Sequence, residues 1–275
     1  MSLKTSFSIK FLKHSLLSVV LLLGLVFFTL EVTKNITENP PTWMDEGIII
    51  ETARNFAKSG VSGIRISPDE IVSGGYVTTS YTVTYPISIL FNRYGVNLFD
   101  ARLVMVVYMY LALFASLLLI SRVGYRSKYV YASTMFLIIT FAPFYGHGKN
   151  VLGEIPGLFY LFVSMIVLYY FNEIIPRIEV RIRHKLFLLF IASVFTGLAI
   201  VTKPIYILII PAIIIGGILY IYTRYRCSKM FEVRFLAFKK SLWVYIPGAL
   251  LGLSLPIFTW LIYQFHGESL KFILS

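Results

Sequence analysis

A chain of 275 residues in which 57% are hydrophobic and only 14% are charged has too few polar side chains to cover a water-soluble core. The apolar residues form repeated uninterrupted blocks, each close to the roughly 20 residues that an α-helix needs to cross about 30 Å of hydrocarbon. The net charge of +12 does not indicate nucleic-acid binding, because the basic residues flank these blocks, as is typical of membrane proteins. The single cysteine, Cys227, excludes an intramolecular disulfide framework and a multi-cysteine metal site.

The apolar blocks predict an all-α polytopic membrane protein of about seven spanning helices, in one transmembrane domain over residues 1–275. The first block, about Ser15 to Leu30, is long for a signal peptide and has no small-x-small cleavage site behind it, so we expect an uncleaved helix. The fifth and sixth blocks adjoin at Lys203-Pro204, where only a tight turn can separate them. The expected spans lie near residues 13–31, 103–121, 129–145, 155–172, 186–202, 204–222 and 243–263.

The distribution of charge predicts the orientation of these helices. With the N-terminus inside, the four cytoplasmic segments 1–13, 121–128, 172–185 and 223–240 hold 16 of the 25 basic residues and three of the 13 acidic ones. This bias fits the positive-inside rule in every segment and supports the turn at Pro204. We therefore expect a cytoplasmic N-terminus, with the plasma membrane as the favoured location.

A long first loop, residues 32–102, is expected on the outer face. Residues 46–58 place Ile49, Ala53, Phe56 and Ala57 on one helical stripe, which predicts an amphipathic helix on the membrane surface. Several glycines and Pro68 then break the chain, and a second short helix is expected from Tyr85 to Tyr94, ending at Gly95.

Asp45 and Glu46 begin the predicted surface helix. As first-turn acids they could simply favour the helix dipole. Alternatively, a carboxylate at the membrane surface could act as general base on an acceptor hydroxyl or amine. Two adjacent carboxylates are far short of a metal site, although the sequence leaves room for a divalent cation.

Further ionisable residues are expected on the same membrane face. His147, Lys149 and Glu154 lie in the short loop between the third and fourth helices, where Glu154 could be an interfacial helix cap or a site acid. Lys203 and Arg102 could be interfacial anchors, or they could supply positive charge to a phosphate at the outer leaflet.

Four segments in order carry a family resemblance: WMDEGIIIETARNFAKSG, TVTYPISILFNRYGVNLFDARLV, GEIPGLFYLFVS and GLAIVTKPIYILIIPAII. Together, over about residues 10–215, they resemble GT-C glycosyltransferases, and within these the dolichyl-phosphate-mannose protein mannosyltransferase-like and lipid A aminoarabinose transferase families. Members usually have about eleven to thirteen helices, so the chain resembles their N-terminal part.

The resemblance implies a polyprenyl-phosphate-linked sugar donor and transfer to a protein, lipid or glycan acceptor on the outer or lumenal face. It implies Asp45 as catalytic base with Glu46 beside it, Glu154 as a second acid, and Arg102 and Lys203 as contacts to the donor phosphate. His147 and Lys149 are expected to contact substrate from the same loop. A transporter or flippase and a non-catalytic membrane subunit remain alternatives, although transporters usually place ionisable residues within their helices.

Overall fold

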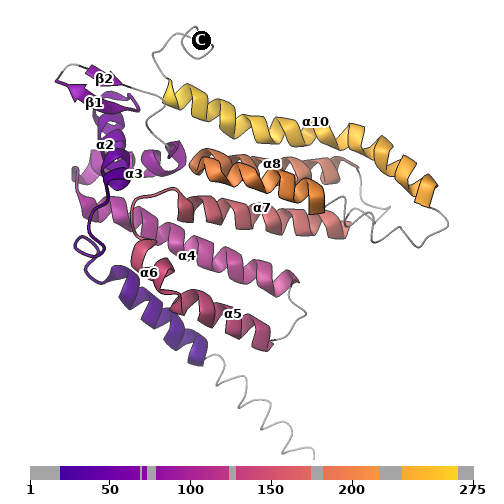
Figure 1. The fold of residues 1–275 in the computed structure, drawn as a ribbon, viewed down its shortest axis with the longest axis horizontal. Helices are drawn as coiled ribbons and strands as arrows, with labels where there is room; N and C mark the ends of the chain where they lie inside the picture. Colours follow the sequence, from indigo (N-terminus) through magenta and orange to yellow (C-terminus); the bar gives the residue numbers. More distant parts are fainter. Residues whose placement is uncertain are drawn as a thin grey trace, which may run out of the picture.

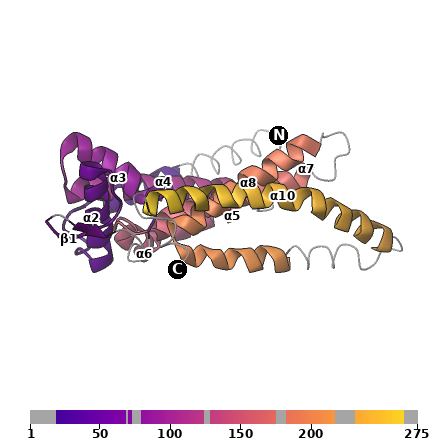
Figure 2. The same ribbon diagram turned by 90° about the horizontal axis from the view of Figure 1, so that it is seen from above.

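The structure is a computed structural model that describes residues 19–68, 70–72, 79–123, 128–174, 182–216 and 231–265. Its long helices lie side by side, and the short elements of the first loop gather at one end of the bundle, here called the loop end (Figures 1 and 2). The elements are a first helix, Val19–Thr33, then α2 Met44–Ser59, β1 Ile64–Ser67, β2 Glu70–Val72, α3 Tyr81–Tyr94, α4 Leu98–Val123, α5 Lys128–Thr140, α6 Ala142–His147, α7 Glu154–Ile174, α8 Ile182–Thr202, the 3-10 helix η1 Pro204–Leu208, which continues as a helix over 209–216, and α10 Phe231–Gln264.

Apolar helices occupy all seven predicted positions within the described residues. By length and composition, four stretches could each cross a membrane: Leu98–Arg122, Glu154–Phe171, Ile182–Thr202 and Tyr245–Gln264. The other three apolar helices, Val19–Thr33, Tyr129–Thr140 and Pro204–Gly216, are shorter as described. The number of seven spans therefore stays a prediction, as does the orientation, because most of the basic loops lie outside the described residues.

The expected continuous span over 129–145 is wrong. The helix is interrupted at Phe141, which has an extended backbone, and it restarts as the short helix α6 with a proline in its first turn. The physical reason is Pro143, whose ring would collide with the carbonyl four residues earlier in an unbroken helix.

The predicted turn at Lys203-Pro204 is present. α8 ends at Thr202, and Lys203 has an extended conformation with φ −148° and ψ 114°, which the following proline favours. The segment after Pro204 leaves α8 and runs back along the bundle as a separate helix (Figure 2).

Both helices expected in the first loop are present, and α3 begins at Tyr81, four residues before its expected start. Gly95 ends α3 with φ 86°, a conformation that glycine adopts easily. A short antiparallel hairpin, β1 with β2, fills a region where only chain breaks were expected. The apolar stripe of α2 is covered by protein: Ile49 and Ala53 are buried against α3 and α4, so they are not available to the membrane surface as predicted.

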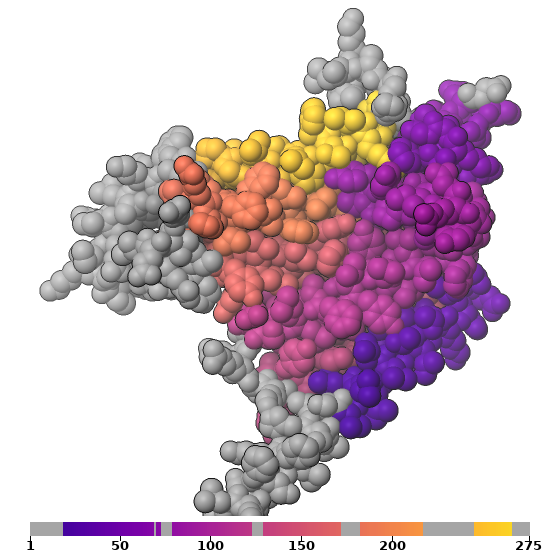
Figure 3. Space-filling model, turned by 180° about the vertical axis from the view of Figure 1, so that it is seen from behind, coloured from indigo at the N-terminus to yellow at the C-terminus, as the bar shows by residue number. Residues whose placement is uncertain are grey.

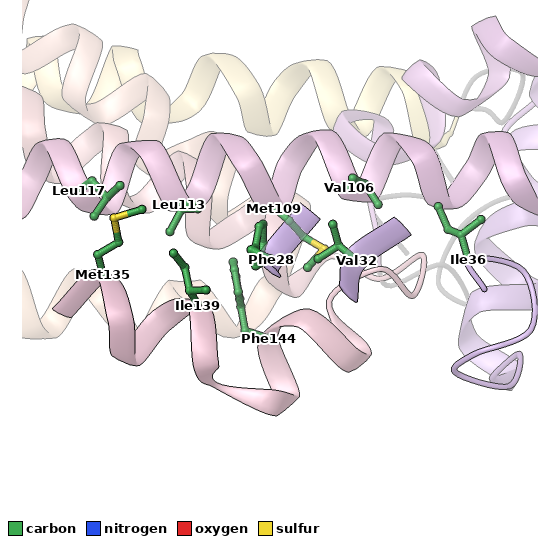
Figure 4. Packing of buried hydrophobic residues seen from close by; sticks show 10 residues of the cluster. All are labelled: Phe28, Val32, Ile36, Val106, Met109, Leu113, Leu117, Met135, Ile139 and Phe144. Atoms are coloured by element: carbon green, nitrogen blue, oxygen red, sulfur yellow. The ribbon is translucent and has the colours of Figure 1, made fainter. Parts of the chain in front are cut away.

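Two apolar clusters share α4 as their common wall. In one, the first helix, α5 and α6 pack on α4 through residues such as Phe28, Met109 and Phe144 (Figure 4). In the other, α2 and α3 pack on the N-terminal part of α4. The first helix and α10 lie at opposite edges of the molecule (Figure 3). The beginning of α4, where Arg102 lies, is thus enclosed by the elements of the loop end.

Candidate functional site

A fully buried ion pair lies at the centre of the loop end. The guanidinium of Arg102 on α4 donates from Nε to Oε1 of Glu46 over 2.8 Å and from Nη2 to Oε2 over 2.7 Å, and both side chains are 0% exposed. Nη1 of Arg102 donates to the carbonyls of Ile36 and Pro40, at 2.8 and 2.9 Å. Every nitrogen of the guanidinium is therefore engaged within the protein, in the bidentate geometry for which arginine is suited.

The same carboxylate fixes the segment that precedes α7. The backbone N–H of Val151 donates to Oε1 of Glu46 over 3.1 Å. Two residues earlier, the ammonium of Lys149 donates to the carbonyls of Glu31 and Lys34, at 3.4 and 2.9 Å. These carbonyls belong to the end of the first helix, where a cation compensates both the unpaired carbonyls and the helix dipole. Burial lowers the pKa of Lys149, the charge of Arg102 lowers it further, and Glu31 opposes the shift.

Asp45 directly precedes the buried pair but faces outward. Its side chain is exposed, as are those of Trp43 and Met44 before it. Among the described residues, no side chain pairs with the carboxylate of Asp45. His147, at the end of α6, is likewise exposed. Adjacent acids that looked equivalent in the sequence thus differ: Glu46 is enclosed, and Asp45 can be reached from outside.

A second ion pair joins the start of α7 to the end of α8. Nζ of Lys203 lies 2.8 Å from Oε1 of Glu154, with the lysine side chain 19% exposed and the glutamate 50% exposed. The hydroxyl of Tyr206 donates to the carbonyl of Glu154 over 2.7 Å. The two backbones are close here, because a Cβ at Gly153 would collide with the carbonyl of Thr202.

Buried hydroxyl groups connect this second pair to α3 and α4. Thr202 and Thr82 share a hydrogen bond of 2.8 Å between their hydroxyls. Tyr108 donates its proton to the carbonyl of Thr82 over 2.7 Å, so the 2.9 Å bond between the hydroxyls of Tyr108 and Tyr160 must be donated by Tyr160. Beside them, burial and then the neighbouring Tyr160 raise the pKa of Tyr81 to about 12, which keeps this phenol protonated.

The structure brings all seven predicted site residues to the loop end, where five of them form two groups. Glu46, Arg102 and Lys149 form a buried group, and Glu154 and Lys203 form a partly exposed one; the segment 149–154 links the two groups. Asp45 and His147 are exposed beside them. Neither Arg102 nor Lys149 is free to contact a substrate as expected, because Arg102 is 0% and Lys149 only 3% exposed and each already binds carbonyls.

Sequence reasoning missed the residues that hold these groups in place. Tyr206 follows the Lys203-Pro204 turn by two residues, and its position beside a predicted site lysine was an available signal. Thr82, Tyr108 and Tyr160 carried none, because hydroxyl groups in apolar helices are common. Within the described ranges no group of three or more His, Cys, Asp or Glu side chains could hold a metal ion, and a divalent cation stays an untested prediction.

The fold is similar to two solved structures of ArnT from Cupriavidus metallidurans. With the apo structure the TM-score is 0.55 at 16% identity, covering 96% of this chain and 45% of that one. With the structure bound to undecaprenyl phosphate the TM-score is 0.53 at 14% identity, covering 92% of this chain and 44% of that one. This chain therefore spans a little under half the length of those proteins. A search among curated proteins finds no match.

The apolar helix bundle, with its loop elements gathered at one end, has the fold of these ArnT structures, and four of its described helices are long and apolar enough to cross a membrane. Residues 70–266, well over half of the chain, match the model of one family. The chain belongs to the dolichyl-phosphate-mannose-protein mannosyltransferase family.

Proposed function

We propose that this chain forms the catalytic loop and part of the donor site of a membrane glycosyltransferase that uses a polyprenyl-phosphate-linked sugar. The observation that carries the proposal is the contrast between Asp45 and Glu46. An exposed carboxylate follows the exposed Trp43 and Met44, and the next residue, Glu46, is fixed by a buried pair with Arg102. Such an arrangement orients a reactive group on a rigid support.

Asp45 would act as general base. Its carboxylate would accept the proton of an acceptor hydroxyl or amine while that group attacks the anomeric carbon of the donor sugar. The bond between this carbon and the phosphate oxygen would break, and polyprenyl phosphate would leave. Glu46 and Arg102 would position Asp45 without touching substrate, because both side chains are 0% exposed.

Lys203 would compensate the charge of the departing phosphate. Its ammonium is the cation of the second ion pair, and the start of α7 and the end of α8 that form this pair lie at the same end of the bundle as α2 (Figure 1). Glu154 and His147 would line the same opening. Lys149 would serve as a support for the first helix, since its ammonium already binds two carbonyls of that helix end. The loop end would face outward from the membrane, with the N-terminus in the cytoplasm.

An apolar groove suits the lipid part of such a donor. A hollow of about 630 Å³ lies between α4, α5 and α7, and Leu161, Met165 and Leu168 are among its lining residues. These three residues follow Glu154 by 7, 11 and 14 positions and so share its helical face. At about 1.5 Å per residue, these three residues lie roughly 10 to 21 Å along α7 from Glu154. The lining residues Leu119 on α4 and Val130 on α5 lie toward the ends of those helices that are away from the loop end. An isoprenoid chain could run from a phosphate at Lys203 into this groove.

The test is transfer from a radiolabelled polyprenyl-phosphate sugar in membranes that contain the protein, compared with Asp45→Asn. We expect transfer by the wild type and a loss of about 100-fold or more for Asp45→Asn, as is usual when a general base is removed. The thermal unfolding midpoint should not change, because Asp45 is exposed. Glu51→Gln, on the same helix, is the matched control and should transfer normally.

Equal transfer by wild type and Asp45→Asn would contradict the role of Asp45. Absence of transfer by the wild type from all donors tried would contradict the enzymatic function itself. A transporter would instead move the labelled lipid across the membrane without forming a glycosylated product, and would keep doing so in Asp45→Asn.

A further inference from the structure

The ion pair between Lys203 and Glu154 poses an electrostatic problem for a phosphate site. With Nζ and Oε1 only 2.8 Å apart, the carboxylate offsets the charge of the ammonium and takes one of its three N–H donors. A phosphate approaching the intact pair would gain attraction from one charge and meet repulsion from the other. A phosphate therefore binds more strongly at Lys203 when the carboxylate moves away.

The surroundings allow the carboxylate to move but restrict the lysine. Lys203 is held through its backbone, where its N–H donates to the carbonyl of Ala199 over 3.1 Å and its carbonyl accepts from Tyr206 over 3.0 Å. Its side chain is 19% exposed, and its Cδ lies beside Gly153. A lysine enclosed in this way has little freedom to reorient.

The side chain of Glu154, in contrast, can reorient. Its backbone is fixed, because Tyr206 donates to its carbonyl over 2.7 Å, but its side chain is 50% exposed. Rotation about the side-chain bonds can carry the carboxylate into solvent without breaking a backbone contact. Half-exposed ion pairs contribute little stability, so the phosphodiester of a lipid-linked sugar, with one negative charge and two non-bridging oxygens, can displace the carboxylate when its lipid chain holds it nearby.

We propose that Glu154 is an exchangeable counter-ion, which occupies Lys203 in the empty protein and is displaced by the phosphate of the lipid donor. The proposal rests on the proposed function, in which Lys203 binds that phosphate. The carboxylate thereby sets the anion selectivity of the site: a free phosphate lacks the apolar anchor needed to displace it, whereas a phosphate held by a lipid chain at the groove is locally concentrated.

The experiment measures the affinity of the purified protein for undecaprenyl phosphate, a donor analogue without sugar. Glu154→Gln keeps the size of the side chain but removes its charge, and we expect the affinity to rise about 3- to 10-fold, as for the loss of one competing charge at a partly exposed site. Glu154→Ala should show the same rise. Lys203→Gln should lower the affinity about 10-fold or more. Inorganic phosphate at millimolar concentration should compete in Glu154→Gln but not in the wild type.

The control is Glu51→Gln. It breaks a comparable ion pair, between Glu51 and Arg54 at 3.0 Å, away from the second ion pair, and the affinity should not change. An unchanged or lower affinity in both Glu154 variants, with a lower affinity in Lys203→Gln, would overturn the exchange and leave the phosphate site standing. An unchanged affinity in Lys203→Gln would overturn the phosphate site and the exchange together.

Discussion

The carboxylate of Glu46 and the guanidinium of Arg102, 56 residues apart in the chain, bind each other through two parallel hydrogen bonds with no exposure to solvent. Through the other contacts of these two side chains, the pair also holds the turn after the first helix and the segment before α7. Four parts of the chain thus meet at one pair of charges.

Breaking this pair from one side should be costly. Arg102→Met leaves a carboxylate buried without its counter-charge, and we expect a loss of about 3–5 kcal/mol in the free energy of unfolding. Glu46→Gln should also destabilise the protein, because it leaves the guanidinium of Arg102 buried without its counter-charge. The double variant should lose less than the sum of the two, because no unpaired charge remains buried. The apparent unfolding midpoint in detergent measures all three variants, and strictly additive losses would contradict the coupling.

The lowered pKa of Lys149 predicts a dependence of stability on pH. When the native pKa lies below the unfolded value of about 10.4, the folded protein disfavours the charged form, and that cost is greatest at neutral pH. The cost is relieved as the pH rises from the native pKa toward the unfolded one. Lys149→Met lacks this term, so the midpoint of the wild type minus that of Lys149→Met should increase between pH 7 and pH 10. A difference that stays constant or shrinks would contradict the shift.

The close approach of α7 and α8 at the second ion pair can be tested with one methyl group. In Gly153→Ala the new Cβ would press on the carbonyl of Thr202, and overpacking of this kind costs about 1–3 kcal/mol. We expect a lower unfolding midpoint together with weaker donor binding, because Lys203 follows Thr202 directly. Gly146→Ala is the matched control: apart from its chain neighbours and the backbone of its own helix, no atom would lie within 4 Å of the new Cβ, so both quantities should be unaffected.

The contact between α8 and α10 is close at two glycines, Gly197 on α8 and Gly252 on α10. A Cβ at Gly252 would lie 2.5 Å from the carbonyl oxygen of Phe190 and 2.9 Å from Cβ of Ser193, so Gly252→Ala should force the helices apart. At Gly248, one turn earlier, the nearest atom would be at 3.8 Å, which is ordinary contact. We expect Gly252→Ala to lower the unfolding midpoint by several degrees and Gly248→Ala to leave it unchanged or raise it. Similar midpoints for both would argue against this packing.

The positions of the helices could be predicted from the sequence because they depend on the length of the apolar blocks and on the proline and glycine residues at which helices end. The turn at Lys203-Pro204 and the end of α3 at Gly95 are examples. The interruption at Phe141 was missed although Pro143 signals it. The hairpin was missed although Ile64 and Ile66 alternate with polar residues before Pro68, a pattern typical of a strand and turn.

The candidate site was predictable as a set of residues at one end of the bundle but not as a network of contacts. One local signal does distinguish Asp45, which is exposed, from Glu46, which is buried: Glu46 precedes Ile49 and Ala53 by three and seven positions and so continues the apolar stripe of α2. That difference depends on Arg102, which reaches Glu46 only when α2 packs on the beginning of α4. The burial of Lys149 likewise depends on the end of the first helix lying above it, a tertiary relationship without a local pattern.

The hold of Lys149 on the last carbonyls of the first helix has a mechanical consequence. This ammonium and the Arg102 contacts to Ile36 and Pro40 fasten both ends of the short connection to the elements that carry the ion pairs. Bilayers of different thickness tilt individual helices. Here a tilt of the first helix would rotate the whole loop end as one rigid unit, and the spacing between Asp45 and Lys203 would be insulated from the thickness of the lipid around it.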